Sequence, residues 1–192
     1  NYTFNEHWSV AGNVGIYYEM PPYTALGFKD KEGNFVNREL KYQRVASGSI
    51  GMNWRPSTRI ILSMEGFYKR YTDMPLCVLD NIPLACKGND YGIFGNEALV
   101  STAQGRAYGV ELLAKWQVPD RINASASLTL YQSEYRNDKH SPYLPSAWDN
   151  HYILNMSCIW SLPRKWDLGA KLSVIGGSPY TPFDEEKSSL VE

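Results

Sequence analysis

The sequence predicts an all-β protein, an antiparallel up-and-down meander of about seven strands that forms a segment of a transmembrane β-barrel. Three observations lead to this prediction. About seven stretches alternate apolar and polar residues, aromatic residues stand at the ends of the apolar faces, and short and long connections alternate along the chain. A period of two is the side-chain repeat of a β-strand. Rings at both ends of an apolar face are typical of strands that cross a lipid bilayer.

Each predicted strand has one apolar face opposite a polar one. In the fourth strand, Tyr108, Leu112 and Trp116 share a face, whereas Glu111 and Lys115 lie on the other. A shift of one residue would turn both charges toward lipid, at about 2–4 kcal/mol for a cation near the bilayer midplane, so one register is strongly preferred. In chain order, the predicted strands are residues 8–19, 45–54, 58–71, 106–117, 122–134, 152–160 and 166–176.

The connections predict how the meander is oriented. Pro56, Pro119 and Pro163 stand in tight turns after the second, fourth and sixth strands. Trp residues gather near these turns and Tyr residues near the long connections, which predicts two aromatic girdles. Short periplasmic turns and long extracellular loops are the plan of outer-membrane barrels. The long connections, rich in Gly, Pro, Asn, Asp and Lys, are about residues 20–44, 72–105 and 135–151.

Composition excludes several classes of protein. The 192 residues carry a net charge of −1 without a basic cluster, so nucleic acid is not an expected partner. No run of about 18 apolar residues is present, which excludes a transmembrane helix. The chain starts at Asn1 without a signal peptide, and we expect it to be a fragment.

A soluble β-barrel or sandwich used for binding or adhesion is the alternative, because its strands alternate in the same way. Such a domain would bury its bulky aromatics in the middle of the strands. Here the strand middles hold Gly, Ala, Val, Leu and Ile, and the rings are terminal. The opposite face is mostly Ser, Gly, Asn, Thr and Tyr with single charges such as Glu65 and Lys171, which indicates a lumen lining.

Signals for catalysis, cofactors and metals are absent from the sequence, and we expect none of the three. The histidines are far apart, and no phosphate-loop, dinucleotide or hydrolase motif occurs. An outer-membrane enzyme that uses His151 would need a catalytic set that the sequence does not show. Cys77 and Cys86 fall in one loop-like region, where a local disulfide is favoured in an oxidising compartment and two free thiols are the alternative.

Four strings of residues resemble TonB-dependent outer-membrane receptors. They are residues 105–112, residues 65–71 before a long loop, residues 148–150 at the start of a strand, and residues 176–182 at the end of one. They stand in order at strand spacing, and the resemblance covers nearly the whole chain. It implies a barrel of about 22 strands, closed by an N-terminal plug domain, that imports a scarce nutrient of the siderophore, vitamin or glycan class.

The resemblance also implies location and partners. We expect the bacterial cell outer membrane, contact with outer-membrane lipid, a small-molecule or glycan ligand, and the TonB complex reached through an N-terminal region outside this chain. Residues 1–192 would be a partial barrel without the plug, the TonB box and the C-terminal strands. They would contribute wall, lumen surface and extracellular loops. Loop aromatics that could contact the ligand are Tyr23, Phe28, Tyr91, Phe94 and Tyr143.

Overall fold

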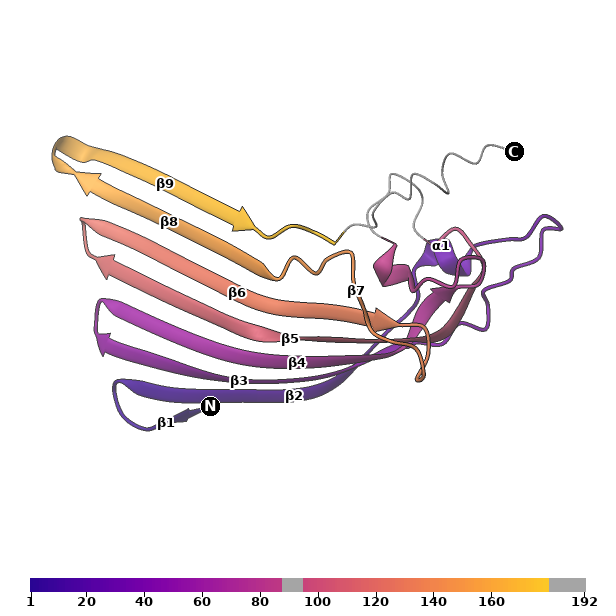
Figure 1. The fold of residues 1–192 in the computed structure, drawn as a ribbon. Coiled ribbons are helices and arrows are strands. Elements are labelled where there is room, and N and C mark those ends of the chain that lie inside the picture. Colours follow the sequence, from indigo (N-terminus) through magenta and orange to yellow (C-terminus); the bar gives the residue numbers. More distant parts are fainter. Residues whose placement is uncertain (88–94, 180–192) are drawn as a thin grey trace.

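The computed structural model describes residues 1–87 and 95–179, and they form one open, curved antiparallel sheet (Figure 1). Helix is confined to single turns in the connections. The elements are β1 (Tyr2–Thr3), β2 (Trp8–Glu19), α1 (Tyr23–Leu26), β3 (Gln43–Ser57), β4 (Ile60–Cys77), η1 (Leu84–Cys86), β5 (Leu99–Val118), β6 (Ile122–Arg136), β7 (Leu144–Pro145), β8 (Tyr152–Leu162), η2 (Pro163–Lys165) and β9 (Trp166–Ile175).

The sheet is the predicted meander. Neighbours in the sheet are neighbours in the chain, in the order β1-β2-β3-β4-β5-β6-β8-β9, and every pair is antiparallel. The described residues form nine strands instead of the predicted seven or so, because the two-residue strands β1 and β7 also pair, with β2 and β6. Two residues are too short to show a period of two, so the sequence pattern could not reveal them.

Strands β4 and β5 are longer than predicted, with 18 and 20 residues. Asp73 and Pro75 favour turns, which is why residues 72–105 were expected to form one long loop. In the structure, Asp73 adopts a left-handed φ of 57° within an irregular stretch of β4, and pairing resumes as far as Cys77 opposite Leu99. A bulge accommodates an extra residue and a proline without ending the strand.

The tight turns and the long connections lie at opposite ends of the sheet (Figure 1). The turns β3–β4, β5–β6 and β8–β9 meet at one end, and α1, η1 and β7 lie at the other. This arrangement confirms the rims predicted from the connection lengths. No helix among the described residues is long and apolar enough to cross a membrane.

The most buried residues of the described chain lie at the long-loop end. Ala25 of α1, Cys77 of β4, Leu84 of η1 and Leu99 of β5 form one buried cluster, with Leu40 packed against it. Most residues along the strands stay partly or fully exposed, and all of β9 is exposed. The sheet is therefore a wall with two open faces, and the loops pack chiefly on one another.

Candidate functional site

The two faces of the wall differ sharply in chemistry. On one face, large apolar side chains project away from the sheet, including Val14 (88% exposed), Ile50 (67%) and Leu168 (58%). Burial of an aliphatic side chain of this size is worth about 1.5–3 kcal/mol, so such a face needs an apolar environment. The face has the length and composition of a lipid contact, and we call it the outer face.

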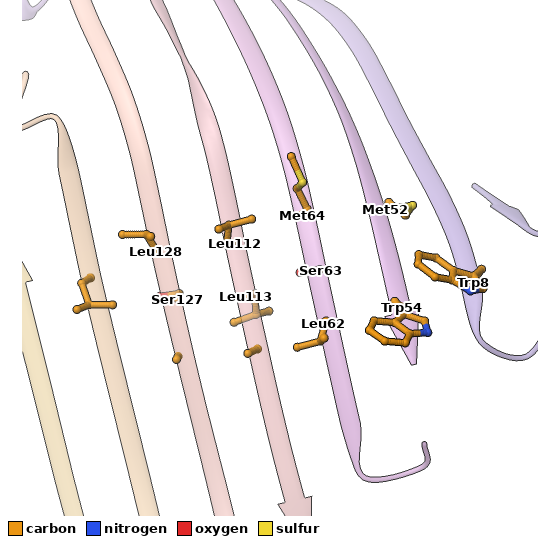
Figure 2. Close-up of a pocket in the computed structure, with 13 residues that line it drawn as sticks. Trp8, Met52, Trp54, Leu62, Ser63, Met64, Leu112, Leu113, Ser127 and Leu128 are labelled. Atoms are coloured by element: carbon orange, nitrogen blue, oxygen red, sulfur yellow. The ribbon is translucent and has the colours of Figure 1, made fainter. Parts of the chain in front are cut away.

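Aromatic residues end the outer face, as predicted. Near the tight turns, Trp8 of β2 stacks on Trp54 of β3 with ring centroids 5.4 Å apart. Near the long loops, Tyr68 of β4 stacks on Tyr108 of β5 at 6.3 Å. Figure 2 shows Trp8 and Trp54 beside Met52, Leu62 and Met64, which line a shallow apolar hollow on this face. Its lining suits an acyl chain better than a polar ligand.

The opposite, lumen-side face is polar and is hollowed near the loops. Glu65 of β4 lies directly opposite Glu111 of β5, and Lys69 of the same face lies with its Nζ 5.7 Å from the Phe67 ring. This surface offers hydroxyls, amides, carboxylates and an ammonium, so it can hydrogen-bond a polar ligand. The hollow is lined by Asn13, Tyr17, Val45, Ser47, Ser49, Glu65, Phe67, Lys69, Tyr71 and Glu111.

Strand β6 approaches two glycines of β5 closely on the lumen face. The Tyr135 ring lies over Gly105 and contacts the Tyr71 ring at 5.6 Å between centroids. At Gly109 the backbone of β6 itself comes close, because a Cβ there would lie 2.7 Å from the Tyr131 Cβ and nearer still to the backbone oxygen of Leu130. The two glycines in residues 105–112 are thus explained by the close approach of a tyrosine ring at Gly105 and of the β6 backbone at Gly109, which a larger residue would obstruct.

Asn37 joins two of the long connections. It is buried (1% exposed), and its Nδ2 donates to the backbone oxygens of Ala25 at 2.8 Å and Glu97 at 2.7 Å. Its Oδ1 accepts the backbone N–H of Leu99 at 2.8 Å. One side chain therefore satisfies three backbone groups, and it fixes the β2–β3 connection to the start of β5.

A second cluster in these loops is centred on Lys87. Its Nζ lies 2.6 Å from Asp80 Oδ2 and 2.5 Å from Glu97 Oε2, and the Cys77 thiol donates to Glu97 Oε2 at 2.8 Å. Burial alone would lower the pKa of Lys87, but the two carboxylates outweigh it and raise that pKa. Cys77, Asp80 and Glu97 have the spacing of metal ligands, yet the lysine ammonium already compensates their charge.

The disulfide favoured for Cys77 and Cys86 is not formed in the structure. Cys77, Cys86 and Cys158 are all free. Cys77 is directed to the Glu97 carboxylate rather than to the second thiol. Burial raises the pKa of Cys86 to about 11, so this thiol stays protonated at neutral pH and is a weak nucleophile.

The residues 148–150 that contribute to the family resemblance fasten the β6–β8 connection to β6. Asp149 is buried, and its Oδ1 accepts the backbone N–H of Ser133 at 3.0 Å. The Tyr131 hydroxyl donates to the backbone oxygen of Trp148 at 2.7 Å. His151 lies 3.6 Å from Asp149, and among residues 1–87 and 95–179 no serine or cysteine side chain bonds its ring.

The structure separates the predicted loop aromatics. Tyr23 begins α1 and is 79% exposed, and Phe28 is half-buried just beyond that helix. Tyr143 contacts two guanidinium groups, with Arg106 at 4.1 Å and Arg136 at 4.7 Å from its ring centroid. Tyr91 and Phe94 lie outside the described residues. Asn37 was not predicted from the sequence, because no residue pattern distinguishes a buried asparagine in a loop from an exposed one.

The apolar and polar faces, the terminal aromatics and the two unequal rims define the chain as part of the wall of a transmembrane β-barrel of the outer-membrane type. A family model described as "TonB dependent receptor-like, beta-barrel" matches residues 1–186. The chain therefore belongs to the TonB-dependent receptor β-barrel family, whose members are transport receptors of the bacterial outer membrane and not enzymes.

Solved structures with a similar fold are receptors of this kind. The ferric-catecholate import receptor Fiu from E. coli is 16% identical with a TM-score of 0.65, and the match covers 91% of this chain and 23% of that one. The FrpB iron transporter from Neisseria meningitidis is 15% identical with a TM-score of 0.60, and the match covers 88% of this chain and 24% of that one. The alcaligin outer-membrane receptor FauA from Bordetella pertussis is 16% identical with a TM-score of 0.57, and the match covers 91% of this chain and 28% of that one.

This chain spans about a quarter of the length of these structures, and at such low identity the match concerns the fold. Among curated proteins, no sequence matches this chain. The comparisons confirm the predicted family, the fold class and the outer-membrane location.

Proposed function

We propose that this chain is one part of a receptor that imports a scarce nutrient of the siderophore, vitamin or glycan class through the outer membrane. The main support for this proposal is the polar hollow on the lumen face, which opens beside loops that are hydrogen-bonded to one another. A lumen surface with carboxylates, amides and tyrosines suits a polar, hydrogen-bonding ligand. The similar structures, named as importers of iron compounds, support the transport class and leave the ligand of this chain open.

The remaining parts of the receptor are also proposed. We infer that residues 1–192 are a partial barrel, and that a plug domain, a TonB box and further strands, including the C-terminal ones, belong to the same receptor. This is supported by the share of the similar structures that the chain covers, about a quarter. It is also supported by strand β9, which pairs with β8 along one edge only among the described residues. A barrel needs its sheet to close, because open strand edges expose unpaired backbone groups.

The candidate ligand contacts follow from exposure. Tyr23 is the best placed of the loop aromatics in the described chain, because its ring is open and α1 is held by the Asn37 bonds. Phe28 is less accessible, and the Tyr143 ring is already in contact with two arginines. Tyr91 and Phe94 stay predictions from the sequence. On the lumen face, Tyr17 and Tyr71 line the hollow, and we propose them as ligand contacts deeper in the barrel.

The experiment uses the full-length receptor in outer membranes. Binding of a ferric siderophore panel, cobalamin and oligosaccharides is measured with the wild type, with Tyr23→Ala and with Tyr152→Ala as the control. Tyr152 is an outer-face residue of β8, so its loss should leave ligand affinity unchanged. We expect one ligand class to bind, with affinity lowered about tenfold by Tyr23→Ala, and its uptake to stop when the proton gradient is dissipated. Uptake that continues without the gradient contradicts TonB-driven import.

A further inference from the structure

Arginines gather on the outer face, just beyond the tyrosine girdle of the long-loop rim. In β4 and β5, Tyr68 lies directly opposite Tyr108, and two residues nearer the rim Arg70 lies directly opposite Arg106. Alternation along each strand puts Arg70 and Arg106 on the same outer face as the two tyrosines. Arg44 of β3 and Arg136 of β6 occupy corresponding outward positions. We call Arg44, Arg70, Arg106 and Arg136 the rim arginines.

The rim arginines have more positive charge than their surroundings compensate. Glu134 lies among them, and its carboxylate is already paired with Arg106 at 2.7 Å. Arg70 stands opposite Arg106, and like charges that face each other across a strand pair are destabilising. Among the described residues, Arg70 has no hydrogen-bond or ion-pair partner. This part of the outer face therefore carries uncompensated positive charge, which an anion would neutralise.

Arg44 provides an independent observation. Its Nε is buried and has no hydrogen-bond partner in the described structure. A buried donor without an acceptor costs about 1–3 kcal/mol, so native proteins nearly always supply one. The register places Arg44 between Tyr18 and Thr72, diagonal to Arg70, at a spacing that long side chains can bridge.

The other two rim arginines are held in place by neutral and acidic partners. Arg136 donates from Nη2 to Gln104 Oε1 at 2.6 Å and from Nη1 to the backbone oxygen of Lys139 at 3.2 Å. The Tyr143 ring lies against both Arg106 and Arg136. A guanidinium that is already oriented loses less freedom when it binds an anion, and its fork suits the oxygens of a phosphate.

We propose that the rim arginines bind the phosphate groups of an anionic lipid in the extracellular leaflet of the outer membrane. The depth of the rim arginines in the membrane fits a lipid headgroup. Amphipathic rings mark the edge of the hydrocarbon, and Arg70 lies about 7 Å farther out along its strand. At that depth an arginine on the lipid face costs only about 0–1 kcal/mol, whereas the headgroup phosphates supply the missing acceptors. The position on the outer face separates this site from the ligand surface on the lumen side, so it adds a lipid site to the proposed receptor.

The test compares two neighbouring residues on opposite faces. Arg70→Gln and Lys69→Gln remove the same charge, but Arg70 faces outward and Lys69 lines the lumen hollow. Native mass spectrometry of the full-length receptor in neutral detergent is used to follow binding of diphosphoryl lipid A, phosphate-free diacylglycerol and inorganic phosphate. Heat-modifiable migration on gels shows that each variant is folded.

We expect Arg70→Gln to weaken lipid A binding about tenfold, the double variant with Arg44→Gln to weaken it further, and Lys69→Gln to change it less than twofold. Diacylglycerol should not show this dependence. Wild-type affinity of the folded double variant, or an equal loss in Lys69→Gln, overturns the proposal. Inorganic phosphate that binds as tightly as lipid A, with the same dependence on Arg70, overturns it in favour of a site for free anions. Ligand binding on the lumen side is measured in the same variants, so failure of this site and failure of the import function are told apart.

Discussion

Replacing Asn37 by alanine should loosen the long connections without disrupting the sheet. The substitution removes three hydrogen bonds at once and leaves the oxygens of Ala25 and Glu97 and the N–H of Leu99 without their partner. At about 1 kcal/mol for each bond, the local free energy of opening falls by about 3 kcal/mol. The strands keep their own ladders, so the loss is confined to the loops.

Hydrogen exchange of the full-length receptor measures this loss directly. A decrease of about 3 kcal/mol corresponds to amide exchange about a hundredfold faster, expected at Leu99 and in the peptides that contain α1. Asn34→Ala is the matched control, because Asn34 lies in the same connection but is exposed and bonds only within it. Exchange at Leu99 within about threefold of the wild type would refute the role given to Asn37.

Three further predictions concern the wall and the Lys87 cluster. Leu112→Arg should destabilise the barrel by about 2–4 kcal/mol and Leu113→Arg far less, in guanidinium unfolding, since alternation along β5 turns these adjacent residues to lipid and to the lumen. Gly105→Ala should cost about 1–3 kcal/mol in the same assay because a tyrosine ring occupies the site, whereas Gly66→Ala meets no atom within 4 Å and should cost about 0.5 kcal/mol or less. Burial tends to raise the pKa of Asp80, but its lysine partner outweighs this and holds that pKa below 3.8, so the ion pair stabilises the loop above that pH. Pepsin cleavage of the loop, relative to cleavage of an unfolded reference substrate at the same pH, should therefore increase as the pH falls below 3.8, and a ratio that does not change would contradict the assignment.

The fold could be predicted because its signals are local. In residues 106–117 the alternation of apolar and polar residues and the terminal rings are visible within one strand, and the structure confirms that face as the outer one. Strand ends were less predictable. Asp73 and Pro75 have turn-forming chemistry, but pairing with β5 holds them in an irregular strand, and this pairing depends on residues far along the chain.

The site was less predictable, because its key contacts involve backbone atoms distant in sequence. Asn37 donates hydrogen bonds to the backbone oxygens of Ala25 and Glu97. Every residue has a backbone oxygen, so a sequence pattern cannot indicate which one is the acceptor. The disulfide prediction failed for a related reason. Closeness of Cys77 and Cys86 in the chain could not show that Glu97, 20 residues beyond Cys77, accepts the Cys77 thiol.

The long connections act on one another, which bears on how a ligand would be sensed. Asn37 ties the β2–β3 connection to the start of β5, and the Asn137 Nδ2 donates to the backbone oxygen of Asn81 at 2.6 Å, tying the β6–β8 connection to the β4–β5 connection. On its other side the β6–β8 connection places Tyr143 against two rim arginines. A ligand can shift such a network only through contacts that differ between its arrangements. A ligand that displaces residues 137–143 would therefore strain the Asn137 bond and the stacking of Tyr143, and the β6–β8 connection would carry that motion from the lumen mouth to the lipid-facing rim.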